Sequence, residues 1–198
     1  MKSYIDNLRA ELKQSGTTYP RVTNLSGKIQ KKVNSVIKKT AYQAIPDYDP
    51  GMPVIEANSS YKTTLNKNGI LSLRFEDYFY PEMAAHGVTG VSSVTVNLYT
   101  GHIYCFNELF RVGTDYRSEL TKLIQAEIIT RQIPMLKPFT GIEDEADFYL
   151  TPDSLVIYYQ PYVYTPGYYG VLEFVIPYNQ IINIIDPQGP IKKVLSGI

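Results

Sequence analysis

Hydrophobic positions recur along the chain at two spacings, one typical of helices and one typical of strands. Apolar stripes at the i, i+4, i+7, i+8 spacing of an amphipathic helix predict helices over residues 26–44 and 114–131. Ser26 stands where it could cap the first helix, and Thr114 or Asp115 where one could cap the second. The two stripes are Ile29, Val33, Val36, Ile37, Ala41 and Ala44 in the first helix, and Tyr116, Leu120, Leu123, Ile124 and Ile128 in the second.

Strict alternation of apolar and polar residues predicts strands between the two helices. Residues 61–79 indicate a hairpin, because Asn68-Gly69 supplies the positive φ angles of a tight turn and the residues after it alternate. A second alternating strand follows at 93–98, and the turn at Thr100-Gly101 leads into residues 103–106.

The C-terminal third, residues 148–178, contains three apolar strands separated by turn signals, and a short helix is expected at 178–185. Tight turns imply antiparallel pairing, so the predicted fold class is α+β, an antiparallel sheet with helices packed on one face. Residues 1–53 form an N-terminal segment and helix, residues 54–198 form the main domain, and we expect one compact unit. The expected core includes Val33, Ile37, Leu73, Val96, Leu120, Ile124, Ile157 and Phe174.

A tyrosine-rich break, Gln160 to Gly170, separates the last two strands. Its prolines and glycines cannot sustain regular pairing, so it should bulge or loop. Four of its tyrosines then cannot all point inward, and we expect some of them to form an exposed aromatic surface that contacts a partner. A stack of core tyrosines is the alternative. The candidate binding residues are Tyr162, Tyr164, Tyr168 and Tyr169, and the expected structural positions are His86, Gly101, Gly167 and Gly170.

Composition removes several function classes. The 19 basic and 19 acidic residues balance, which argues against a nucleic-acid binder. The lysines of residues 26–44 fall mostly on the polar helix face, which we interpret as solvated, a patch for phosphates or anionic polymers being the alternative. The single cysteine, Cys105, lies in an apolar run and is expected to be a small buried residue. No apolar run is long enough to span a membrane, and no signal-peptide core stands at the N-terminus.

The sequence offers no motif for catalysis, and we expect no catalytic residue, cofactor or metal. Asp47 and Asp49 lack further ligands at EF-hand spacing, and the acidic run at 143–147 is interpreted as an exposed connector. Glu76 and Asp77 are neighbours on a strand and should point to opposite faces. His102 is expected to face solvent, and His86 to be a hydrogen-bonded structural histidine within a tight loop.

Several segments resemble a known family. Residues 77–87 include a loop with Ala85-His86, residues 96–103 include the Thr100-Gly101 turn, and Leu109-Phe110 follows. Together with the tyrosine-rich tail at 148–177, these resemble the RsiV C-terminal domain, a domain of unknown function. Residues 19–22 and the first helix resemble the PdaC N-terminal module that often precedes it. The resemblance covers about residues 17–186.

The resemblance implies an extracytoplasmic sensing or binding role. In this family the anti-sigma factor is a membrane-anchored regulator whose outer domain binds lysozyme, and in the deacetylase the module accompanies a separate catalytic domain. This sequence differs from both in showing no transmembrane helix, sigma-binding region or deacetylase domain, so the role we expect it to share is sensing or binding rather than signalling or deacetylation. The expected function is a non-catalytic binding domain at the bacterial envelope, for a lysozyme-like protein or cell-wall glycan. The alternative is a cell-wall hydrolase or deacetylase accessory protein with a dispersed site, which a cleft joining His86 to carboxylates would favour.

Overall fold

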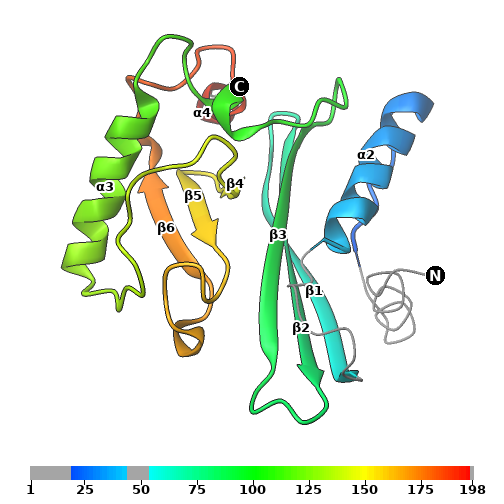
Figure 1. Cartoon of the computed structure of the whole chain (residues 1–198). Helices are drawn as coiled ribbons and strands as arrows, with labels where there is room; N and C mark the ends of the chain where they lie inside the picture. Colours follow the sequence, from blue (N-terminus) through cyan, green and yellow to red (C-terminus); the bar gives the residue numbers. More distant parts are fainter. Residues whose placement is uncertain (1–18, 44–53, 197–198) are drawn as a thin grey trace.

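The structure is a computed structural model that describes residues 19–43 and 54–196, so the predicted loop with Asp47 and Asp49 lies outside the described residues. In chain order its helices and strands are α2 (Gly27–Ala41), β1 (Val54–Lys67), β2 (Ile70–Pro81), β3 (Val88–Asn97), α3 (Tyr116–Thr130), β4 (Phe148–Leu150), β5 (Ser154–Tyr159), β6 (Leu172–Pro177) and α4 (Pro190–Leu195). The predicted α+β class is confirmed. The strands form two antiparallel three-stranded sheets, ordered β1-β2-β3 and β4-β5-β6 (Figure 1).

Helix α2 packs against the first sheet and lies on the side of the molecule opposite α3 (Figure 1). The helix buries Val33, Ile37 and Ala41 against apolar side chains of β2 and β3. The predicted hairpin turn is present, since Asn68 and Gly69 both have positive φ and β1 pairs with β2 on either side of them. The stripe read from the sequence is therefore the face that α2 buries.

The second sheet lies between α3, which packs on one of its faces, and the first sheet, which packs on the other. Leu120 and Ile124 of α3 join the core that contains Ile157 and Phe174, while Val156 and Tyr158 of β5 pack with Val91 of β3. Every residue of β5 is buried, because alternate side chains meet different layers. All eight predicted core residues are buried.

Hydrogen bonds and an ion pair also join the two sheets. The Leu150 amide donates to Ser72 Oγ at 3.0 Å, and the Tyr158 hydroxyl donates to Ser93 Oγ at 3.0 Å. Arg74 of β2 donates from Nε to Glu173 Oε1 of β6 at 3.0 Å. These polar contacts fix the register of one sheet on the other, so the loops that leave both sheets have defined relative positions.

The predicted final helix at 178–185 is wrong in extent. Only Tyr178–Gln180 forms a short 3-10 turn. The backbone beyond it pairs with the segment before α3, since the Arg111 amide donates to the Ile184 carbonyl at 2.8 Å and the Asp186 amide to the Leu109 carbonyl at 3.0 Å. This tertiary pairing overrides the apolar pattern, and the last helix, α4, begins instead at Pro190, which suits a first helical position.

Candidate functional site: the tyrosine loop between β5 and β6

The connection between β5 and β6, residues 160–171, is here called the tyrosine loop. It forms the predicted break in pairing, with turns closed by Tyr162 N to Thr165 O at 3.1 Å and Tyr169 N to Pro166 O at 2.9 Å. Gly170 has a φ of 76°, in the region that favours glycine. The side chain of Gln160 also clamps the loop to β3, donating to the Val91 carbonyl at 2.6 Å and accepting from the Val91 amide at 2.9 Å.

The four candidate tyrosines separate into exposed and packed side chains. Tyr168 is 82% exposed and Tyr162 is 51% exposed, whereas Tyr164 is buried and Tyr169 is half-buried. The prediction that only some of them face solvent is thus correct in geometry. Tyr162 and Tyr168 are the two rings that a partner can reach.

Tyr162 is held in place by residues from distant parts of the chain. Its ring stacks on His86, with 6.4 Å between ring centroids and 16° between planes, and its hydroxyl lies 3.1 Å from His86 Nε2. Its backbone φ of 69° lies in the left-handed region, which costs a non-glycine residue about 1 kcal/mol or more. A Cβ on Gly167 would collide with the Tyr162 ring, so only glycine leaves room for this ring position.

His86 is hydrogen-bonded as expected, but it is exposed rather than enclosed by its loop. Its Nδ1 lies 3.1 Å from the Gly87 carbonyl, and its Nε2 faces the Tyr162 hydroxyl. Met83 in the same loop is 94% exposed and also has a positive φ, of 62°. The contact between His86 and Tyr162 therefore joins the loop at 82–87, which also carries the exposed Met83, to the tyrosine loop, which also carries the exposed Tyr168.

Tyr164 and Tyr169 connect the tyrosine loop to the interior and to α3. Tyr164 packs edge-on against Tyr159 and Phe139, at centroid distances of 4.8 and 5.5 Å, and burial raises its pKa. The Tyr169 hydroxyl accepts a 2.8 Å hydrogen bond from Arg131 at the end of α3. These two tyrosines support the loop, so Tyr162 and Tyr168 are the two of the four whose rings are mostly exposed.

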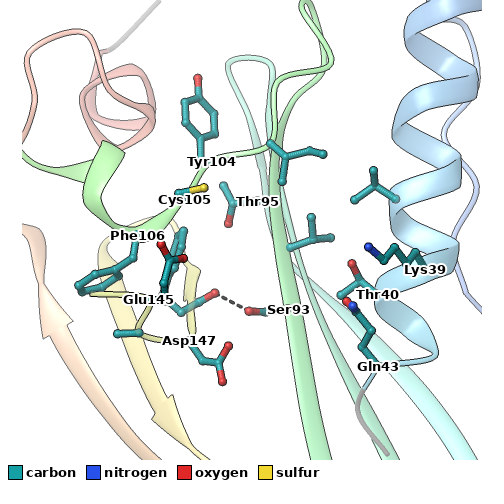
Figure 2. A pocket seen from close by; sticks show the side chains of 15 residues that line it. Lys39, Thr40, Gln43, Ser93, Thr95, Tyr104, Cys105, Phe106, Glu145 and Asp147 are labelled. Carbon is teal, nitrogen blue, oxygen red and sulfur yellow. Dashed lines mark hydrogen bonds between the residues drawn. The ribbon is translucent and has the colours of Figure 1, made fainter. Parts of the chain in front are cut away.

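A hollow that the sequence did not predict lies between α2, β3 and the acidic connector at 143–147 (Figure 2). Its volume is about 360 Å³, with Lys39 and Gln43 on the α2 side and Glu145 and Asp147 on the other. Burial, followed by the charge of Glu143, raises the pKa of the Asp147 carboxyl. The lining residues come from three distant segments and share no local motif, and the acidic run was the one signal in the sequence.

Cys105 lines this hollow and is exposed, so the expectation of a buried cysteine is wrong. Cys105 is the N-cap of the 3-10 helix Phe106–Leu109 and does not belong to a strand. Its amide donates to Glu108 Oε2 at 2.7 Å. Although the residue is exposed, partial desolvation at the hollow, with the charges of Glu108 and Glu145 adding to it, raises the pKa of the thiol. The thiol is therefore protonated at neutral pH and is a weak nucleophile.

The remaining residues considered for chemistry do not converge. His102 is exposed as expected and pairs with Glu108 at 2.8 Å. Glu76 pairs with Arg74, whereas Asp77 on the opposite face is buried. Across residues 19–43 and 54–196, no three His, Cys, Asp or Glu side chains gather closely enough to hold a metal ion. No helix in that part of the chain is long and apolar enough to cross a membrane.

Gly101 occupies the turn that follows β3. Its φ of 68° requires the left-handed region, and its amide donates to the Asn97 carbonyl at 2.8 Å. The Asn97 side chain accepts from the amides of Tyr99 and Thr100, which closes the turn. Gly101 is a turn position with no contact to the tyrosine loop surface.

Comparison with known proteins gives a family match over part of the chain. Residues 107–179 match the family described as a protein of unknown function (DUF3298). The matched residues include α3 and the whole tyrosine loop. No curated protein sequence matches the chain.

Two solved structures share the fold. A DUF3298 family member from Bacteroides fragilis NCTC 9343 has a TM-score of 0.58 at 18% identity, covering 86% of this chain and 68% of that one. A DUF3298 family protein from Pseudomonas aeruginosa PAO1 has a TM-score of 0.56 at 15% identity, covering 98% of this chain and 82% of that one. At these identities the likeness concerns the fold.

Proposed function

We propose that the protein is a non-catalytic binding domain that works outside the cytoplasm, at the bacterial cell envelope, and that the tyrosine loop contacts its partner. One observation carries the proposal: Tyr162 is exposed yet fixed by the His86 stack, by a left-handed backbone and by the space that Gly167 leaves. Backbone strain at an exposed residue is typical of functional positions. A ring already fixed in place loses little further conformational entropy when it binds.

The chemistry of this surface suits a protein or a glycan. Tyrosine combines a large apolar ring with a polar tip, and it is enriched among the residues that contribute most to protein interfaces. Met83, three residues before His86, adds an exposed and adaptable apolar side chain to the same loop. The resemblance of the C-terminal tail to the RsiV C-terminal domain, and of the first helix to the PdaC N-terminal module, supports lysozyme and cell-wall glycan as first probes.

The contacts of His86 favour binding over catalysis. The alternative, an enzyme with a dispersed site, is favoured by a cleft that joins this imidazole to carboxylates. The imidazole contacts instead the Tyr162 hydroxyl and a backbone carbonyl. The acidic residues Glu145 and Asp147 line the separate hollow beside α2.

The test is an alanine scan of the four tyrosines, with binding to hen lysozyme and to soluble peptidoglycan fragments measured by calorimetry. Tyr162→Ala and Tyr168→Ala should each weaken binding by about 2 kcal/mol, or roughly 30-fold, as for central interface tyrosines. Tyr164→Ala should lower the melting temperature, because it removes a buried ring.

The matched control is Tyr99→Ala, which removes a ring that is 72% exposed but lies on the turn after β3. This variant should bind as the wild type does. If neither probe binds the wild-type protein, or if the Tyr162 and Tyr168 variants bind as tightly as the control, the proposed function is wrong.

A further inference from the structure

Positive charge is concentrated in a groove beside α2, although basic and acidic residues balance over the whole chain. Residues 19–43 contain six basic residues and no Asp or Glu, although the whole chain has no net charge. All six are exposed, and none of them forms an ion pair with a described carboxylate. They are Arg21, Lys28, Lys31, Lys32, Lys38 and Lys39.

The groove has a defined wall. The Asn34 side chain accepts from the Val22 amide and donates to the Val22 carbonyl, both at 2.8 Å, which fixes the segment 19–25 along α2. The Gln30 side chain accepts from the Leu25 amide at 3.3 Å, and Tyr19 packs edge-on against Tyr42 with 6.1 Å between centroids. The segment and the helix therefore enclose a space rather than presenting scattered surface lysines.

The lining of this space is cationic along its length. Arg21 stands on the wall formed by segment 19–25, and Lys31 and Lys38 stand on the helix wall, around a volume of about 460 Å³. Lys31 and Lys38 are two helical turns apart, or about 10 Å along the axis. Among the residues that the structure describes, no carboxylate lines the groove. Three cations in one row, none of them paired with a carboxylate of residues 19–43 or 54–196, match a ligand that carries successive anionic groups. The hydrogen-bonding side chain of Ser35 lies between Lys31 and Lys38 in the sequence of the helix.

We propose that this groove binds a linear polymer of phosphodiester-linked polyol or sugar units. Lysine is an effective phosphate ligand, and arginine can bind phosphate through two parallel hydrogen bonds. This site is separate from the tyrosine loop and does not depend on the function proposed for it.

Two observations favour such a polymer over nucleic acid or a membrane. Tyr19 is half-buried with its ring edge-on to Tyr42, so it offers no open platform for stacking bases. None of the large hydrophobic side chains that are exposed in the described structure lies between residues 19 and 43, so the groove has no apolar anchor for a lipid surface.

The experiment measures binding of fluorescently labelled poly(glycerol phosphate), of about ten units, to the full chain by anisotropy. If three cations contact phosphates, affinity should fall about 20-fold between 50 and 200 mM salt, the dependence expected for a flexible polyanion. The double variant Lys31→Glu/Lys38→Glu should bind at least 10-fold more weakly. The control Lys62→Glu/Lys67→Glu changes the net charge equally at exposed positions of β1 and should change affinity less than twofold.

A second variant tests the groove itself. Asn34→Ala releases the Val22 segment without changing charge, and it should weaken poly(glycerol phosphate) binding several-fold while Lys62→Glu/Lys67→Glu does not. Equal loss in the groove and control charge variants would overturn the proposal. Tighter binding of single-stranded DNA or of vesicles rich in anionic phospholipid would also overturn it. Tyr162→Ala should leave this binding unchanged, which separates the result from that for the tyrosine loop.

Discussion

Replacement of Asp77 by asparagine should stabilise the protein at neutral pH. Asp77 is 1% exposed on β2, and Ser59 lies opposite it on β1. Within the described residues, neither of its carboxylate oxygens accepts a hydrogen bond of good geometry. Burial raises its pKa from 3.8 to about 6, although the neighbouring Ser59 hydroxyl opposes the shift in part and Glu76 adds to it. The folded state therefore holds this proton over a pH range in which the unfolded state has lost it.

The sign and size of the effect follow from this difference in pKa. Well below pH 4 the carboxyl is protonated in both states, and its titration does not change the free energy of unfolding. Between pH 4 and 6 stability falls as pH rises, because the unfolded state releases the proton more readily. A shift of about two units corresponds to about 3 kcal/mol of destabilisation above pH 6.

Asp77→Asn should remove most of this cost, with a gain of about 1–3 kcal/mol at pH 7.5 since the amide also lacks a partner. The assay is urea unfolding of wild type and variant at pH 4 to 8. Glu56→Gln, at an exposed position of β1, is the control and should follow the wild type. A variant that is less stable than wild type at pH 7.5, with an unchanged pH dependence, would refute the reasoning.

Further predictions concern the core, the tyrosine loop and metal. Leu120→Ala or Ile124→Ala should destabilise by about 2–5 kcal/mol in urea unfolding because both side chains are fully buried, and a cost near zero would show that the α3 face is wrong. Gly167→Ala should displace the Tyr162 ring and shift the Tyr162 and His86 ring signals in NMR spectra, whereas unchanged spectra would contradict the packing. Chelation with EDTA should leave the melting temperature unchanged, and a sharp fall would reveal a metal site.

Local patterns predicted the elements well where local physics decides them. The stripe containing Val33 and Ile37, and the positive φ angles at Asn68-Gly69, depend on residues close in sequence, and both are as predicted. The division into two sheets depends on side-chain contacts between distant strands, such as Tyr158 with Ser93, which a local pattern does not encode. The same limit explains the misplaced final helix, where pairing with the segment before α3 decides the backbone.

The sequence predicted that the candidate site is a loop, but it did not predict which of its tyrosines are exposed and which are packed. Prolines and glycines between β5 and β6 indicated the break in pairing. The burial of Tyr164 depends on Phe139, and the position of Tyr162 depends on His86, which lies 76 residues earlier. The burial of Cys105 was predicted wrongly for a related reason. Its apolar neighbours indicated a buried residue, whereas Cys105 caps a 3-10 helix and is exposed.

The most direct test of the central claim is to map bound partner onto the molecule by NMR. Amide shifts of ¹⁵N-labelled protein would be followed during titration with hen lysozyme and, separately, with soluble peptidoglycan fragments. We expect one of these probes to produce its largest shift changes in the tyrosine loop and at residues 82–87, around Tyr162, Tyr168 and His86. Shift changes confined to α3 or to the hollow beside Cys105, with both loops unaffected, would contradict the claim that the tyrosine loop is the binding surface.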